Sequence, residues 1–190
     1  VNSAFAKSEA LMNGFDEAIM LTSEGHVSEG SAENIFMLVN GELVTPSASE
    51  NILLGITRET IMQLARRELD RITRERQIDR TELYVADEIF LTGTGAQICP
   101  VIEVDHRPVG TGKIGALTET LQQTYHEVVR GMRPEYRDWL TPVYAKSHTK
   151  ADHAVTAGKA ASNGHNGNSA HNGHTNGHAK TRSGGKARTR

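Results

Sequence analysis

The sequence predicts an α/β (α+β) fold, in which a mixed sheet built partly from hairpins packs against helices. Short apolar segments of strand length are separated by turn residues, and Asn40-Gly41 is the strongest hairpin signal among them. Two longer segments, at 57–69 and 114–130, carry apolar residues at helical spacing instead. Because strands in hairpins mix with helices along the chain, a mixed sheet packed with helices is the expected arrangement.

The first half of the chain is expected to hold one helix and three strands. Gly14 is a plausible stop for the first helix, since glycine readily ends helices. In order, a helix, a strand, a turn and a two-stranded hairpin are expected at residues 3–13, 17–22, 23–26 and 34–45.

The second half is expected to contain two long helices with strands between them. Thr57 is predicted to cap the helix over 57–69, whose apolar face holds Ile61, Leu64, Ala65 and Leu69. The elements that follow are a helical turn, two strands, a turn and a helix, at residues 83–87, 88–91, 98–104, 105–108 and 114–130. The last helix carries the apolar stripe Leu117, Leu121, Thr124, Tyr125 and Val128.

The composition changes near Lys146, and this change sets the predicted domain boundary. Residues 1–145 are expected to fold, whereas 146–190 read as a disordered tail rich in His, Asn and Gly, with little to bury. The tail holds eight Lys and Arg against Asp152, a charge of +7, so the total of −2 leaves −9 for the body. An acidic body argues against nucleic-acid binding, and the basic tail is too sparse to indicate it.

Composition also limits the cellular locations, cross-links and metal sites that the sequence allows. No apolar run approaches the roughly 20 residues that a membrane helix needs, so no membrane partner is predicted. Cys99 is the only cysteine, which rules out an internal disulfide and favours a cytoplasmic location. We expect Cys99 to be a small core residue. The tail histidines are irregularly spaced, and no metal site is predicted.

The functional interpretation rests on motifs between Glu29 and Val101. They read Glu29-Gly-Ser-Ala-Glu-Asn-Ile-Phe36, then Leu43-Val-Thr45, then Leu53-Leu-Gly-Ile-Thr-Arg58, then Thr92-Gly-Thr-Gly-Ala-Gln-Ile-Cys-Pro-Val101. This order resembles the fold-type IV pyridoxal phosphate enzymes, and within them the branched-chain amino-acid aminotransferases. The resemblance covers residues 1 to about 144, the large C-terminal domain of that family.

The resemblance implies pyridoxal 5'-phosphate as the cofactor. Glu29 would face the pyridine nitrogen, where a carboxylate keeps that nitrogen protonated and deepens the electron sink. The amides of Gly55, Ile56 and Thr57 would bind the phosphate. A helix start favours an anion in any case, because its amides are free and its dipole is positive there.

A second group of donors is expected in the turn after Thr92. A hydroxyl and successive amides among small residues can form an anion-binding nest. By the resemblance, Thr94 would contact the phosphate, while Gly95 and Ala96 would bind the substrate carboxylate.

The family's Schiff-base lysine is matched by no position in this sequence. Counting back from Glu29 places it roughly six residues before Val1, beyond which the small N-terminal domain would lie. Lys7 reads as a solvated lysine on a helix face. We therefore expect a large-domain fragment that lacks its catalytic lysine and is inactive by itself.

The activity implied is transamination of leucine, isoleucine or valine with 2-oxoglutarate, in a homo-oligomer whose other partners are small amino acids and 2-oxo acids. Two alternatives stay open at this point. One is a D-amino-acid aminotransferase or an aminodeoxychorismate lyase of the same fold. The other is a non-catalytic scaffold, in which the basic tail contacts partners.

Overall fold

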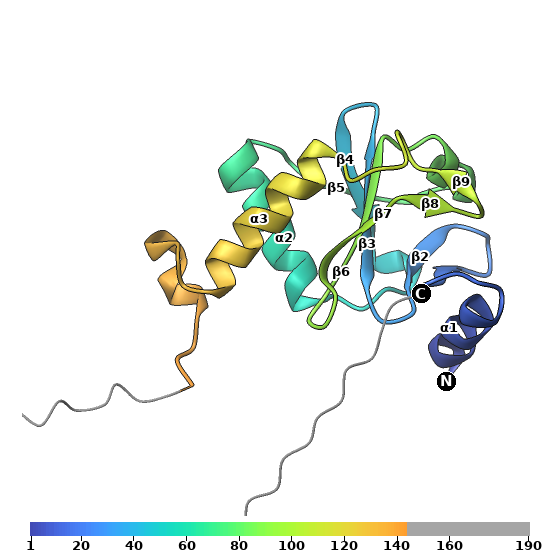
Figure 1. Cartoon of the computed structure of the whole chain (residues 1–190), viewed down its shortest axis with the longest axis horizontal. Helices are drawn as coiled ribbons and strands as arrows, with labels where there is room; N and C mark the ends of the chain where they lie inside the picture. The colour runs from blue at the N-terminus through green and yellow to red at the C-terminus, as the bar shows by residue number, and fades with distance from the viewer. Residues whose placement is uncertain (144–190) are drawn as a thin grey trace, which may run out of the picture. The chain divides into compact units, whose positions relative to one another are not determined.

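A five-stranded mixed sheet forms the centre of residues 1–143, the part of the chain that the computed structural model describes (Figure 1). The strand order is β5-β4-β3-β6-β7; the β4–β5 pair is parallel and the other three pairs are antiparallel. The strands are β3 (Asn34–Val39), β4 (Glu42–Pro46), β5 (Arg74–Arg76), β6 (Glu88–Gly93) and β7 (Gln97–Val101). The predicted mixed α/β class is confirmed, whereas the predicted tail lies outside the described residues.

The hairpin of β3 and β4 forms where the sequence predicts it. Asn40 and Gly41 have φ values of 51° and 78°, and a two-residue turn that matches the strand twist needs positive φ at both positions. Val39 pairs with Glu42 directly beside the turn. The local turn chemistry therefore sets the register of both strands.

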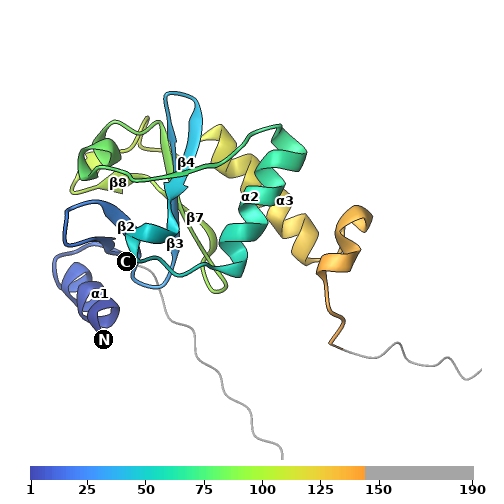
Figure 2. The same cartoon turned by 180° about the vertical axis from the view of Figure 1, so that it is seen from behind.

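Two helices cover one face of the sheet: α2 (Ile56–Leu69) and α3 (Ala116–Val129). They lie side by side in both Figure 1 and Figure 2. The apolar faces predicted for these helices are turned toward the sheet, where Phe36 and Phe90 stack with ring centroids 5.1 Å apart. The buried cluster on this face consists of Phe36, Leu43, Ile61, Leu64, Ala65, Phe90, Ile98, Leu121, Val128 and Tyr136.

A second apolar cluster fills the opposite face of the sheet. Side chains alternate along a strand, so Ile89 and Leu91 of β6 point away from Phe90 and join this cluster. It is covered by β2 (Val27–Gly30) and the 3₁₀ helix η2 (Arg80–Tyr84). The two clusters make a core on both sides of one sheet.

Smaller elements surround this core. β1 (Ile19–Leu21) pairs with β2, and β8 (Glu103–Val104) pairs with β9 (Arg107–Pro108). The first helix, α1 (Asn2–Met12), buries none of its residues. The remaining 3₁₀ helices are η1 (Ala48–Glu50) and η3 (Pro134–Trp139).

Two predicted element starts differ from the structure. Thr57 does not cap α2: Gly55 is the N-cap, because its carbonyl oxygen already accepts a 3.1 Å hydrogen bond from the Glu59 amide. The helical turn predicted at 83–87 lies at η2 instead, where Asp79 and Glu82 cap it reciprocally.

The predicted strand over 98–104 is interrupted. β7 ends at Val101 and β8 begins at Glu103, because the carbonyl oxygen of Ile102 accepts a 2.9 Å hydrogen bond from the Val109 amide outside the main sheet. Asp105 and His106, with φ of 49° and 60°, then form the predicted turn. The chain therefore leaves the main sheet early and makes a small second hairpin.

The prediction that Cys99 belongs to the core is wrong. β7 is an edge strand, and Cys99 is exposed while its neighbour Ile98 is buried under the helices. Strand alternation alone places the two on opposite faces. Within residues 1–143, no helix is both long and apolar enough to cross a membrane.

Candidate functional site

Glu29 lies near the end of β2, half-buried, and links two other segments of the chain. Its Oε2 accepts a hydrogen bond of 2.9 Å from the Leu53 amide and one of 3.3 Å from Nδ2 of Asn34. The same Nδ2 donates to the carbonyl oxygen of Leu53 at 2.7 Å. The end of β2, the start of β3 and the loop before α2 are thereby held at one point.

Gly55 follows this loop and begins the helix entry. A Cβ added at Gly55 would collide with Oδ1 of Asn34, so the close approach of the two segments requires glycine. The Gly55 amide is already used, since it donates to the Leu53 carbonyl at 3.0 Å. The amides of Ile56, Thr57 and Arg58 form no hydrogen bond within the described residues, and α2 has no side-chain cap. These three amides are therefore the free donors at this helix end.

The turn between β6 and β7 carries Thr94, Gly95 and Ala96. Thr94 and Gly95 are exposed and Ala96 is half-buried. Figures 1 and 2 both show this turn beside the N-terminal end of α2. The structure thus brings the two predicted groups of anion donors to the same edge of the sheet. This edge is formed by strand ends: β4 and β6 end there and β3 begins there.

The loop after Glu29 reaches the same edge. A Cβ added at Gly93 would lie 3.2 Å from the carbonyl oxygen of Ala32, so the loop packs directly on the end of β6. Asn34 pairs with Thr92 in the sheet. The Thr92 hydroxyl is buried and has no hydrogen-bond partner within residues 1–143. A polar group of this kind at the base of the turn needs a partner.

Lys7 is paired rather than freely solvated, which corrects the sequence-based interpretation. Its Nζ donates to Oε2 of Glu17 at 2.7 Å and to the carbonyl oxygen of Asp16 at 2.5 Å. The hydrogen bond with Glu17 raises the pKa of Lys7. Burial by itself raises the pKa of Glu17, but the bonds from Lys7 and from the Ala18 amide help to lower it overall. Both groups are therefore held in their charged forms.

Arg58, next to the helix entry, has a structural role. It is buried, and its Nη2 donates to the Pro46 carbonyl at 3.1 Å and to Oε2 of Glu75 at 2.6 Å. These bonds tie the first turn of α2 to β4 and β5.

Sequence reasoning missed the contacts that place the loop before α2. Nδ1 of His26 lies 3.6 Å from Oε2 of the buried Glu50, just before the loop. Ser28 donates to the Glu50 carbonyl at 2.7 Å. The motif from Glu29 to Phe36 includes Asn34, but only the fold shows that its side chain bridges Glu29 and Leu53.

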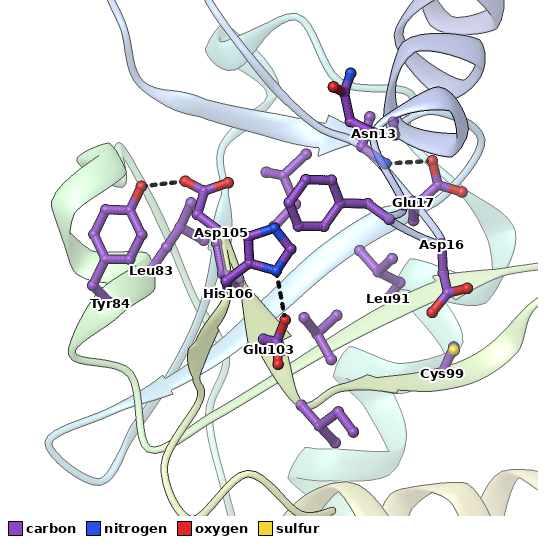
Figure 3. Close-up of a pocket in the computed structure, with 18 of the residues that line it drawn as sticks. Asn13, Asp16, Glu17, Leu83, Tyr84, Leu91, Cys99, Glu103, Asp105 and His106 are labelled. Carbon is purple, nitrogen blue, oxygen red and sulfur yellow. Dashed lines mark hydrogen bonds and ion pairs between the residues drawn. The ribbon is translucent and has the colours of Figure 1, made fainter.

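A cavity of about 680 Å³ lies on the opposite face of the sheet, between the segment after α1 and the β8–β9 hairpin (Figure 3). The rings of Phe15 and His106 stack at its mouth with centroids 4.5 Å apart. At its rim the Tyr84 hydroxyl donates to Asp105 at 2.6 Å. None of the predicted cofactor or substrate residues lines this cavity, so it is separate from the site at the end of β2. Within the described residues, no group of three or more His, Cys, Asp or Glu is placed to hold a metal ion.

The motifs that converge at this edge agree with a comparison against known families. A sequence model of the family described as Amino-transferase class IV matches residues 1–104. The chain belongs to the class IV aminotransferase family. The match includes Glu29, Gly55 and Thr94, and thus every part of the edge described above.

Relatives of this class IV aminotransferase chain carry a more specific name. A probable branched-chain-amino-acid aminotransferase of Aquifex aeolicus is 56% identical over 146 residues, which are 77% of this chain and 47% of that protein. The branched-chain-amino-acid aminotransferase of Pseudomonas aeruginosa is 45% identical over 143 residues, 75% of this chain and 46% of that protein. The chain spans about half the length of the curated relatives it matches.

Solved structures agree with these relatives. A branched-chain amino acid aminotransferase of Thermobaculum terrenum in its PLP form superposes with a TM-score of 0.73 and is 46% identical, covering 76% of this chain and 47% of that one. The branched-chain aminotransferase of the archaeon Thermoproteus uzoniensis, solved with norvaline, gives a TM-score of 0.72 at 48% identity, covering 75% and 47%. The expected fold-type IV aminotransferase architecture is thereby confirmed.

Proposed function

We propose that this chain forms the cofactor-binding domain of a branched-chain amino-acid aminotransferase, which exchanges amino groups between leucine, isoleucine or valine and 2-oxoglutarate with pyridoxal 5'-phosphate. One observation carries the proposal. Glu29, the free amides of α2 and the Thr94–Ala96 turn converge on one edge of the sheet. A carboxylate beside two groups of anion donors complements a molecule with a cationic ring nitrogen and a phosphate.

Pyridoxal phosphate, when bound, supplies an electron sink for reactions at the substrate α-carbon. Glu29 would hold the proton on the ring nitrogen. Its Oε2 is fixed by Leu53 and Asn34, while Oε1 forms no hydrogen bond within residues 1–143. A carboxylate has lone pairs for several donors, so Oε1 can accept one more without disturbing the network.

The phosphate would be bound at the start of α2 and by the neighbouring turn. The Ile56 and Thr57 amides and the Thr94 hydroxyl are donors without a capping side chain in the way. Gly55 would contribute through its small size, because its own amide is used internally. The amides of Gly95 and Ala96 would bind the substrate carboxylate.

The proposal places the covalent lysine outside these 190 residues. Lys7 is the lysine nearest to Glu29 in sequence, but its amine is protonated and paired with Glu17. A protonated amine has no lone pair with which to attack a carbonyl carbon. We therefore expect no transaminase turnover from the chain alone.

The role of Glu29 can be tested through the protonation state of the bound ring nitrogen. We would add pyridoxal phosphate labelled with ¹⁵N in the ring and record its ¹⁵N chemical shift at neutral pH. The wild-type chain should give the shift of a protonated pyridine, and Glu29→Gln should give that of a neutral one. Glu24→Gln, which changes an exposed carboxylate in the same β1–β2 hairpin, is the control. A neutral nitrogen in the wild-type complex would exclude the proposed role.

The substrate class needs a separate experiment. Residues 1–143 can replace the matching segment of the Aquifex aeolicus relative, which is 56% identical. We expect this hybrid to transaminate leucine with 2-oxoglutarate. Turnover of D-alanine, or elimination from aminodeoxychorismate, in place of leucine turnover would support the alternative activities of the same fold.

A further inference from the structure

The residue that follows the Thr94–Ala96 turn has an unusual backbone conformation. Gln97, the first residue of β7, has a φ of 57°, which lies in the left-handed region. Residues other than glycine rarely adopt this region, and they keep such a conformation where the surrounding structure holds them in it. Gln97 is half-buried and pairs with Gly93 across the turn. Its conformation therefore determines how the turn is closed.

α3 holds Gln97 in place. Nε2 of His126, in the last turn of α3, lies 2.6 Å from Oε1 of Gln97, and this carbonyl oxygen requires the His126 nitrogen to be the donor. One helical turn earlier, Nε2 of Gln122 donates to the Ile98 carbonyl at 3.0 Å. The helix thus contacts the first two residues after the turn.

α3 is also fixed at its other end, at the start of the same hairpin. The carboxylate of Glu88, the first residue of β6, accepts hydrogen bonds from the Leu117 and Thr118 amides at 3.1 and 2.8 Å and from the Thr118 hydroxyl at 2.7 Å. A Cβ added at Gly115 would collide with Glu88, so the fit is close. α3 therefore connects the base of the β6–β7 hairpin to its tip.

We propose that His126 and Gln97 are positioning residues that hold the Thr94–Ala96 turn in its anion-binding conformation. The inference rests on the proposed function of that turn. Thr94 and Gly95 are exposed, so the turn has few contacts of its own to order it. Donors fixed before the ligand arrives bind more tightly, because binding then carries no further cost of ordering them.

The first test measures order in the ligand-free chain. Backbone order parameters at Gly95, Ala96 and Gln97 should be about 0.85 in the wild type and fall below about 0.6 in His126→Leu. His126→Gln keeps a donor of similar reach and should restore them. Gln123→Ala removes a different α3 hydrogen bond, to the Glu127 side chain, and should change nothing at the turn. An unchanged turn in His126→Leu would overturn the proposal.

A second variant separates the hydrogen bond from backbone preference. Gln97→Gly removes the bond to His126 but accepts a positive φ without strain. If the bond orders the turn, Gln97→Gly should lower the order parameters as His126→Leu does. A fully ordered turn in Gln97→Gly would show that backbone geometry alone is enough, and would overturn the role of His126.

Ligand titration separates this inference from the proposed function. Pyridoxamine 5'-phosphate should shift the amide signals of Thr94, Gly95 and Ala96 in the wild type, with pyridoxamine lacking the phosphate as the control. His126→Leu should weaken this binding roughly tenfold, and His126→Gln should restore it. Signals that do not move in the wild type would refute the function proposed for the turn, while the order parameters would still decide whether His126 holds it.

Discussion

Glu29 and Leu53 lie 24 residues apart in the sequence, yet Oε2 of Glu29 accepts a 2.9 Å hydrogen bond from the Leu53 amide. The amide group of Asn34 contacts both residues, so one buried side chain closes the network. The position of the loop before α2 therefore depends on a few polar contacts, and changes at those contacts should have large effects.

Asn34→Asp should lower the free energy of unfolding. The new carboxylate cannot donate to the Leu53 carbonyl. It also repels Oε2 of Glu29, which in the wild type accepts a 3.3 Å hydrogen bond from Nδ2 of Asn34. The expected loss is about 1–3 kcal/mol, measured by urea denaturation at neutral pH. Asn40→Asp is the matched control, because the exposed hairpin turn tolerates Asp at positive φ. Equal stability of the two variants would contradict this account of the network.

Gly55→Ala should disturb the same loop through size alone. The added methyl group meets Oδ1 of Asn34, which must move and weaken its bonds to Glu29 and Leu53. We expect a loss of about 1–3 kcal/mol together with weaker binding of pyridoxamine 5'-phosphate. In Gly95→Ala the methyl group meets no atom within 4 Å, so its unfolding free energy should barely change. A similar loss in both variants would show that the collision with Asn34 is not the cause.

Lys7 should react slowly with acylating reagents. Its pKa is raised by the hydrogen bond with Glu17, so little neutral amine is present at neutral pH. Mass spectrometry after brief acetylation should show less modification at Lys7 than at the exposed Lys113. Glu17→Gln should increase the modification of Lys7 selectively. Faster labelling of Lys7 than of Lys113 in the wild type would mean that the ion pair does not form in solution.

Tyr136 should ionise late in an alkaline titration. Burial, with the hydrogen bond to Glu68, raises the pKa of Tyr136 from 10.0 to about 12. Because the folded pKa is the higher one, this contribution to stability is complete below pH 10 and is lost as the pH rises toward 12. The chain has four tyrosines, and the pKa of Tyr84 is raised as well, chiefly by its hydrogen bond to Asp105. Tyr136→Phe should therefore reduce the late rise in phenolate absorbance, and an unchanged late rise in Tyr136→Phe would assign it to another tyrosine.

Local signals in the sequence predicted most of the fold. Asn40-Gly41 determines its own turn, and the apolar residues from Ile61 to Leu69 reveal the helix face they share. Contacts between distant segments were not predictable in this way. Cys99 lies in a strand as expected, but only the strand order shows that β7 is at an edge and leaves it exposed.

The candidate site shows the same division between local and distant information. The motifs predict roles for Glu29 and Thr57, whereas the Leu53 partner of Glu29 and the use of the Gly55 amide depend on the folded loop. Thr57 illustrates the limit well, since threonine is a common cap but the helix had already begun at Ile56. A hydrogen bond between segments far apart in the chain leaves no periodic trace in the sequence.

The parallel pairing of β4 and β5 has a consequence for the electrostatic potential at one edge of the sheet. A helix that joins two neighbouring parallel strands must run back across the sheet, opposite to both of them. α2 makes this connection, so its amino end, with the positive end of its dipole, must lie at the edge where β4 ends. β3 runs antiparallel to β4 and starts at that edge, with Asn34. The direction in which the chain crosses the sheet thus sets the sign of the electrostatic potential at this edge, and this backbone contribution does not depend on the side chains.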